Sequence, residues 1–278
     1  MGQHWQAINP FARKLIARQR LFFVASAPLS SDGHVNVSPK GHASETFAII
    51  NNNQVAFLDL SGSGVETIAH VRENGRIVFM FCNFEDSPCI LRLWGKATVH
   101  ERGTPQFNSL MGSAFQAAAT TAAPASGTAS STASDAAGGV SSFVAGARSV
   151  IVADIHHVAS ACGYGVPHME HKQDRDSWVS WAGSKDESTL QQFRIDHNAA
   201  SLDGLDALQA AIDGAKGAVS DISSKGPKGF GAQGAAGCGS CMAGLLQKLV
   251  REAAAGPVLW LSVGLLAGVA LGVHAARR

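Results

Sequence analysis

The sequence has little charge and no surplus of either sign. Charged residues make up 15% of its 278 positions, with 22 lysines and arginines against 21 aspartates and glutamates, so the formal net charge is +1. No basic surplus therefore points to nucleic acid, and no acidic tail is present. Hydrophobic residues reach 46%, although many are alanines in low-complexity stretches. We therefore expect a core of ordinary size and no nucleic-acid partner.

The sequence also has few cysteines and no long apolar run near its N-terminus. The number of cysteines, 5, is odd, and the opening segment is MGQHWQAINPFARKLIARQR. An odd number of thiols without a secretory signal predicts a reducing compartment. Gln6 stands where a myristoylation motif requires Ser or Thr. The N-terminal part of the chain is therefore expected to face the cytosol.

The chain is organised around residues 54–99, which are typical of a strand, a turn, a helix and two further strands. The apolar run 54–60 is followed by a glycine- and serine-rich turn at 61–64. Residues 65–74 then carry apolar side chains at helical spacing. The turn thus leads exposed backbone N–H groups into a helix N-terminus, which is a natural anion-binding site. The strands expected after the helix span 76–82 and 89–100.

Three more strands are expected outside this stretch. Residues 21–27 form an apolar run, and 34–38 alternate enough to be its hairpin partner, ended by Pro39. A short apolar element follows at 46–50. Residues 149–160 return as a strand rich in β-branched side chains.

Helices are expected at both ends of this region. Near the N-terminus, one helix face would carry Ile8, Phe11, Leu15 and Ile16, with a proline in its first turn. Towards the C-terminus, residues 176–181 and 187–198 are predicted to be helices that pack outside the sheet. The second of these brings Leu190, Phe193, Arg194 and His197 close to one face.

Two low-complexity stretches divide the chain. Residues 116–139 are almost wholly Ala, Ser, Thr and Gly, which bury too little apolar surface to order, so we expect a disordered insertion. Glycine-rich sequence at 223–239 is typical of a flexible linker. The predicted organisation is a main domain at 1–205, a Gly/Ala-rich linker with short helices at 206–256, and a terminal segment at 257–275.

The terminal segment predicts a membrane span. Residues 257–275 contain no Asp, Glu, Lys or Arg. A helix of this length extends about 28 Å, close to the hydrocarbon thickness of a bilayer. Trp260 lies near one end as an interface anchor, and Arg277-Arg278 follow the other end. We expect a single-pass C-terminal anchor with the main domain in the cytosol. Glycine recurs every four residues in this segment, at Gly264, Gly268 and Gly272. The pattern is equally consistent with close helix–helix contact and with chance recurrence in a Gly/Ala-rich chain.

No metal site is expected. The adjacent His156 and His157 point to opposite faces of one strand and cannot share one ion. His168 and His171 follow a proline in a turn-like context, which favours structural or solvent-exposed roles. Cys238 and Cys241 have the spacing of half a zinc or redox site, but no second pair is present.

The order of these elements resembles the FMN-binding split barrel of the pyridoxamine 5′-phosphate oxidase superfamily. Three signatures place the chain closest to an uncharacterised branch: HVNVSPKG at 34–41, LDLSGSGVET at 58–67 and CGYGVP at 162–167. The resemblance covers residues 10–205 apart from the insertion. It implies a mainly β (α+β) fold, a split β-barrel with flanking helices, that forms a homodimer and binds FMN at the subunit interface.

The resemblance also implies which residues bind the cofactor. Lys40, at the end of a strand, would pair with the flavin phosphate, although a lone lysine is more often solvated. The hydroxyls at the helix start would be phosphate ligands, helix caps or both. Arg92 matches a strand arginine of the oxidases but suits a surface ion pair equally well. The predicted cofactor-binding set is Asn36, Ser38, Lys40, Ser61, Ser63, Thr67 and Arg92.

The sequence departs from the oxidases at several positions. Gly64 and Val65 replace an Arg-Lys pair, which lowers the expected FMN affinity or moves the phosphate contacts to the backbone and Lys40. Ile90 stands where the oxidases place a glutamine that contacts the flavin. Asp59 is interpreted as a turn or interface residue. The oxidases' C-terminal substrate-binding signature is absent, so pyridoxamine 5′-phosphate oxidation itself is not expected.

Three hypotheses for function remain open at this point. The first is an FMN-dependent oxidoreductase, with NADH or NADPH as a compatible electron donor and no catalytic residue assigned. The second is a non-catalytic module that binds flavin or haem. The third is a scaffold whose cofactor site has decayed, because the Arg-Lys pair is missing. Reduction of the bound flavin by NADH or NADPH with turnover separates the first two, and the absorbance of the purified protein distinguishes flavin, haem and an empty site.

Overall fold

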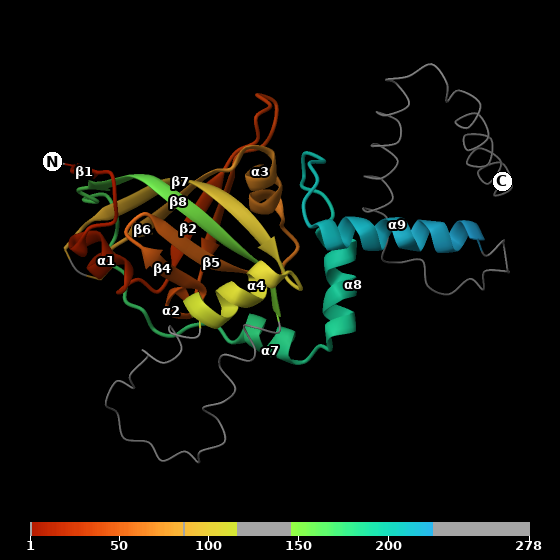
Figure 1. Ribbon diagram of the computed structural model, residues 1–278. Helices are drawn as coiled ribbons and strands as arrows, with labels where there is room; N and C mark the ends of the chain where they lie inside the picture. Colours follow the sequence, from red (N-terminus) through yellow and green to blue (C-terminus); the bar gives the residue numbers. More distant parts are fainter. Residues whose placement is uncertain (1, 86, 116–145, 225–278) are drawn as a thin grey trace, which may run out of the picture. The chain divides into compact units, whose positions relative to one another are not determined.

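The computed structural model describes residues 2–85, 87–115 and 146–224, and all of them belong to one compact unit. The main element is an eight-stranded antiparallel sheet (Figure 1). Its strands are β1 (His4–Trp5), β2 (Phe22–Ser26), β3 (Asn36–Lys40), β4 (Phe47–Asn51), β5 (Gln54–Leu60), β6 (Arg76–Cys82), β7 (Ile90–Glu101) and β8 (Ala147–Ala161).

Helices lie between and after the strands. A short π-helix, η1 (Met111–Phe115), directly follows helix α4 (Pro105–Leu110). The helices are α1 (Pro10–Ile16), α2 (Ala43–Thr46), α3 (Glu66–Asn74), α4 (Pro105–Leu110), α7 (Ser177–Gly183), α8 (Glu187–His197) and α9 (Gln209–Ser224).

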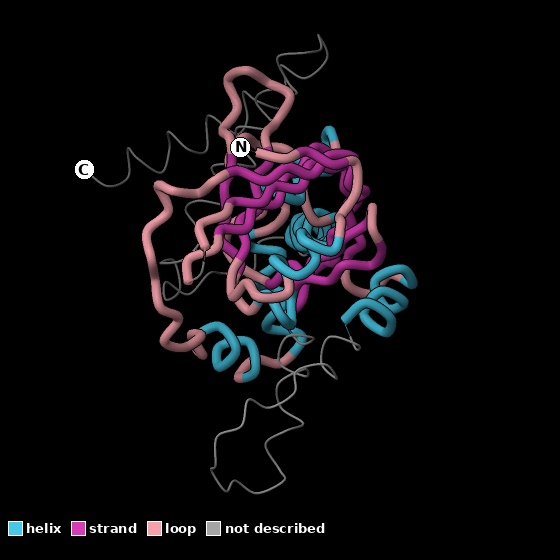
Figure 2. The backbone as a smooth tube through the Cα atoms, turned by 90° about the vertical axis from the view of Figure 1, so that its left-hand side faces the viewer, coloured by secondary structure: helices cyan, strands magenta, loops and turns pink. Residues whose placement is uncertain are grey.

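The sheet curls round until its two ends face each other. Its strand order is β3-β2-β6-β7-β8-β5-β4, with β1 paired to the second half of β8. Although β2 and β5 are separated by three strands, Phe22 of β2 and Phe57 of β5 have ring centroids 6.0 Å apart. The strands therefore curve around a common interior, as Figure 2 shows from a second direction. This arrangement is the open barrel expected from the sequence.

Aromatic side chains fill the barrel interior. Phe22, Phe47, Phe57, Phe79 and Phe81 are all buried and make edge-on or tilted ring contacts. Such contacts stabilise a core beyond the area they bury, by about 0.5–1.5 kcal/mol a pair. A second apolar cluster joins the outer side of β5 and β8 to α4, η1 and α7, where Phe107, Phe115 and Trp178 meet.

Most element boundaries agree with the sequence patterns, with two differences. The strand expected at 34–38 starts at Asn36 and includes Pro39 and Lys40, because β3 is an edge strand in which proline costs no interstrand hydrogen bond. The apolar face predicted for the first helix is found only in part: Leu15 and Ile16 are buried on α1, whereas Ile8 precedes the helix and Phe11 is 50% exposed. Helix α9 lies within the stretch for which short helices were predicted.

Several predictions lie wholly or mainly outside the described residues. These are the disordered insertion at 116–139, the part of the linker beyond residue 224, and the membrane span at 257–275. Among the helices of residues 2–224 that the structure describes, none combines the length and the apolar character needed to cross a bilayer.

Candidate functional site

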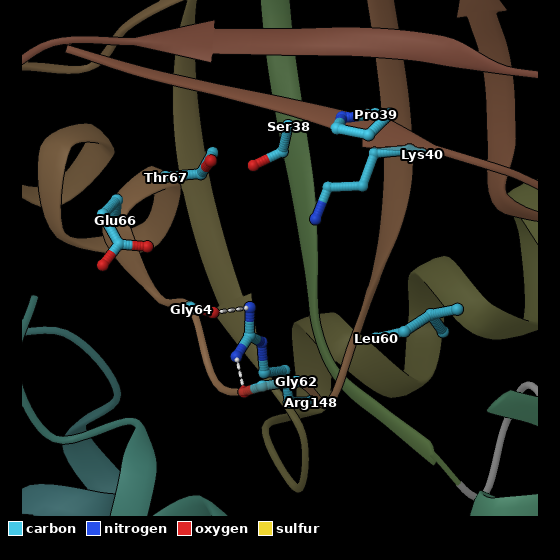
Figure 3. Close-up of a pocket in the computed structure, with 9 residues that line it drawn as sticks. All are labelled: Ser38, Pro39, Lys40, Leu60, Gly62, Gly64, Glu66, Thr67 and Arg148. Carbon is cyan, nitrogen blue, oxygen red and sulfur yellow. Dashed lines mark hydrogen bonds between the residues drawn. The ribbon is translucent and has the colours of Figure 1, made fainter.

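A polar pocket of about 260 Å³ opens where β3 faces the turn between β5 and α3 (Figure 3). Strand β5 ends at Leu60 and α3 begins at Glu66, so the 61–64 turn links them. The pocket is lined by Ser38, Pro39, Lys40, Leu60, Gly62, Gly64, Glu66, Thr67 and Arg148. Three of the predicted cofactor-binding residues, Ser38, Lys40 and Thr67, are therefore brought together.

Beside the pocket, Asp59 is the centre of a buried ion triad. Its carboxylate is 1% exposed and lies 3.0 Å from Lys40 Nζ and 2.7 Å from Arg148 Nε. Burial is the largest single influence and raises the pKa of Asp59, but Arg148 and Lys40 together outweigh it and hold that pKa below its usual value. Asp59 is thus ionised at neutral pH. The interpretation of Asp59 as a turn or interface residue is wrong.

Arg148 also fixes the conformation of the 61–64 turn. Its two terminal nitrogens donate to the carbonyl oxygens of Gly62, at 3.0 Å, and Gly64, at 2.7 Å. Asn198 Nδ2 donates to the same Gly62 oxygen at 2.8 Å. Trp178 Nε1 donates to the carbonyl of Ser61 at 2.9 Å. Side chains from β8, α7 and the end of α8 therefore hold the carbonyl groups of the turn.

Helix α8 reaches the turn through a second arginine. Arg194 Nε donates to the Ser61 hydroxyl at 2.9 Å, and its Nη1 lies 2.9 Å from Glu187 Oε1. Glu187 also takes two hydrogen bonds from Arg102 on the β7–α4 connection. Burial lowers the pKa of Arg194, and the contact with Glu187 opposes that change. The turn is thus anchored on the side of α8.

The remaining predicted residues occupy different surroundings. Asn36 Nδ2 donates to Thr67 Oγ1 at 3.1 Å and to Ser38 Oγ at 3.3 Å, so it orients two hydroxyls of the pocket. The Ser61 side chain is 1% exposed and directed to Arg194. Ser63 is exposed on the turn. Arg92 lies on β7 between Met80 and Ala159 and is not among the pocket-lining residues.

The start of α3 adds positive potential to the pocket. Val65 at the N-cap position makes no side-chain capping bond, so the first-turn N–H groups are not capped by that residue. A helix N-terminus attracts anions with about half an elementary charge. Glu66, in the first turn, has the opposite effect. In the described ranges, no three His, Cys, Asp or Glu side chains come together as metal ligands.

The donor set matches the phosphate group that the sequence resemblance implies. Lys40 Nζ, the hydroxyls of Ser38 and Thr67, and the N-terminus of α3 are all groups that bind phosphate in proteins. These residues thus fit the phosphate end of FMN.

The curled antiparallel sheet with flanking helices fits a split-barrel protein. Residues 8–162 match the family described as pyridoxamine 5′-phosphate oxidase. A pyridoxamine 5′-phosphate oxidase family protein of Aspergillus flavus is 33% identical over a match 216 residues long, which covers 72% of this chain and 76% of that protein. The chain belongs to the pyridoxamine 5′-phosphate oxidase family, and membership supports flavin binding.

Solved structures show more distant similarity. A variant of HupZ from Group A Streptococcus is 15% identical with a TM-score of 0.36, and the match covers 55% of this chain and 99% of that one. An FMN-binding protein from Syntrophomonas wolfei is 14% identical with a TM-score of 0.35, and the match covers 54% of this chain and 83% of that one.

Proposed function

We propose that this protein binds FMN, with the phosphate in the pocket between β3 and the 61–64 turn. The observation that carries the proposal is the grouping of Ser38, Lys40 and Thr67 at the N-terminus of α3 in a chain of this family. Purified full-length protein should carry, or take up, a chromophore with absorbance bands at about 370 and 450 nm, as flavins do. A chain that binds neither FMN nor riboflavin at micromolar concentrations would contradict the proposal.

The residues have distinct roles in this assignment. Lys40 supplies the charge-assisted contact, and Ser38 and Thr67 supply hydroxyl donors. Asn36 holds both hydroxyls, while Arg148 and Arg194 keep the turn in place from behind. When bound, FMN supplies hydride or single-electron transfer. The protein's own contribution is to position the flavin and to exclude water.

We further propose that the protein is an oxidoreductase whose bound flavin accepts electrons from NADH or NADPH. The test is anaerobic reduction of the flavin by each nucleotide, followed by reoxidation and repeated turnover. A flavin that binds but is reduced by neither nucleotide supports the alternative, a non-catalytic flavin-binding module. A Soret band in place of flavin bands supports the haem-binding version of that alternative.

The same proposal includes a homodimer that shares the flavin sites. The donors that line the pocket suit the phosphate, so the flavin ring needs a surface beyond them, and a second copy of the chain is one source of it. Light scattering of the purified protein with and without FMN should give twice the chain mass of 28.8 kDa. A monomer in the presence of bound FMN would rule out a shared site.

A final part of the proposal is membrane attachment through residues 257–275, with the barrel in the cytosol. It is supported by the run of residues without Asp, Glu, Lys or Arg and by its length. Full-length protein should stay with membranes in alkaline carbonate, whereas a chain that ends at Gly256 should not. Release of the full-length chain by carbonate, or protection of its barrel from protease outside intact organelles, would contradict the attachment.

A further inference from the structure

Glu66 places an acidic side chain at the phosphate end of the pocket. It is the first residue of α3, is half-buried, and is one of the pocket-lining residues. Figure 3 shows Glu66 on the same helix as Thr67 and next to Gly64. A Cβ atom built on Gly64 would lie 2.9 Å from Glu66 Oε2, so the carboxylate lies against the turn. Within the described residues, the side chain of Glu66 forms no hydrogen bond or ion pair.

The pocket therefore has no excess of positive charge. Lys40 and Arg148 supply two cations, and Asp59 and Glu66 supply two anions. Arg148 already donates with all three guanidinium nitrogens, to Asp59 and to the carbonyls of Gly62 and Gly64. Lys40 is 3.0 Å from the Asp59 carboxylate. An anion is then attracted by Lys40, whose ammonium keeps donor hydrogens beyond its contact with Asp59, by the hydroxyls and by the partial charge of the helix N-terminus.

We propose that Glu66 sets the affinity of this pocket for a phosphorylated flavin and makes FMN an exchangeable ligand instead of a permanently bound one. The inference rests on the proposed function. A phosphate monoester carries a charge of about −1.5 to −2 at pH 7, and a carboxylate in the lining of the same pocket repels it. Riboflavin has no phosphate, so Glu66 leaves its binding unaffected. The residue thus selects against the phosphate and not against the ring.

If Glu66 had a purely structural role, the expected ligand affinities would differ. An acidic residue in the first turn stabilises a helix through its dipole, whatever the ligand. If that were its only role, Glu66→Gln would lower the melting temperature slightly and change the affinities for FMN and riboflavin equally. The difference between these two ligands therefore separates the proposal from the structural role.

The experiment compares full-length parental chain, Glu66→Gln and Glu170→Gln by titration with FMN and with riboflavin, following flavin fluorescence. Glutamine keeps the size and the helix preference of glutamate. Glu170→Gln removes the same charge from an exposed loop residue outside the pocket and serves as the matched control. We expect Glu66→Gln to bind FMN about five- to tenfold more tightly. Its riboflavin affinity, and both affinities of Glu170→Gln, should equal those of the parental chain.

A second measurement uses the parental chain alone and does not depend on any variant. Raising the salt concentration from about 0.01 M to 1 M shortens the Debye length from about 30 Å to 3 Å. A pocket without excess positive charge should keep its FMN affinity over this range, and the parental chain should lose FMN during gel filtration.

The outcomes separate the inference from the proposed function. If Glu66→Gln binds FMN no more tightly than the parental chain, or gains equally for riboflavin, the inference is overturned. Retention of stoichiometric FMN by the parental chain through gel filtration, or a steep loss of FMN affinity with salt, overturns it as well. In each of these cases the protein still binds flavin, so the proposed function stands. If no version binds either flavin, the proposed function fails.

Discussion

Replacing Asp59 by asparagine tests the central electrostatic feature of the fold. The change keeps the size of the side chain but removes the negative charge shared by Lys40 and Arg148. Arg148, at 4% side-chain exposure, would then be a buried guanidinium paired only with two backbone carbonyls. Lys40, at 24% exposure, can turn towards solvent. Most of the loss is therefore expected from Arg148.

The magnitude follows from the cost of leaving a buried charge without its partner. Removing one member of a buried ion pair costs about 3–5 kcal/mol. For a domain of this size, each kcal/mol lowers the melting temperature by about 2–4 °C, so Asp59→Asn should melt about 6–20 °C below the parental chain. Because the folded-state pKa of Asp59 is lowered, its contribution is present above the unfolded pKa of about 3.9 and is lost as pH falls below that value.

The assay is thermal unfolding by far-UV circular dichroism at pH 7 and at pH 3. The matched control is Asp154→Asn, which changes an exposed aspartate of β8 that accepts a hydrogen bond from Gln54 at 2.8 Å. That variant should lose at most about 1 kcal/mol. The gap between Asp59→Asn and the parental chain should narrow at pH 3. If Asp59→Asn melts as close to the parental chain as the control does, the triad does not stabilise the fold.

Three further predictions concern the site and its support. Lys40→Ala should weaken FMN by about 1.5–3 kcal/mol and riboflavin much less, since it removes a charge-assisted bond; equal losses in titrations of the two ligands would assign Lys40 to the fold. Arg194→Met should lower the FMN affinity and the melting temperature together, because it releases Ser61 from α8; an unchanged affinity would show that the turn needs no support from α8. Burial keeps the pKa of His70 below its ordinary value, so the unfolded chain takes up more protons than the folded chain as pH falls below about 6.5. Urea unfolding should therefore show lower stability at pH 5 than at pH 7. This difference in stability should be smaller in His70→Gln.

Local patterns were sufficient to predict most of the sheet. Strand β6 has the bounds that its β-branched and aromatic run indicates, and β5 ends where the glycine-rich turn begins. Periodicity also located α3 and α8, since both contain apolar residues about one turn apart. Exposure was harder to predict for Phe11, because α1 is a short helix whose buried side is set by Ala12, Leu15 and Ile16.

The site was only partly predictable, because its main interactions join distant parts of the chain. Asp59 and Arg148 are 89 residues apart, and Ser61 and Arg194 are 133 apart. Neither pair has a spacing that a sequence pattern can reveal. A charged residue in an apolar strand, as Asp59 is, requires a buried partner, and that signal was present in the sequence. The identity of the partner depended on the pairing of β5 with β8.

The anchoring of the 61–64 turn has a consequence for the order in which the protein is made. The groups that hold its carbonyls are Arg148, Trp178 and Asn198, and the earliest of them follows Gly64 by 84 residues. Strands β2 to β6 leave the ribosome well before these partners. During synthesis the turn therefore lacks its full support until Asn198 has emerged, and a chain released before that point would have most of the sheet without a finished pocket.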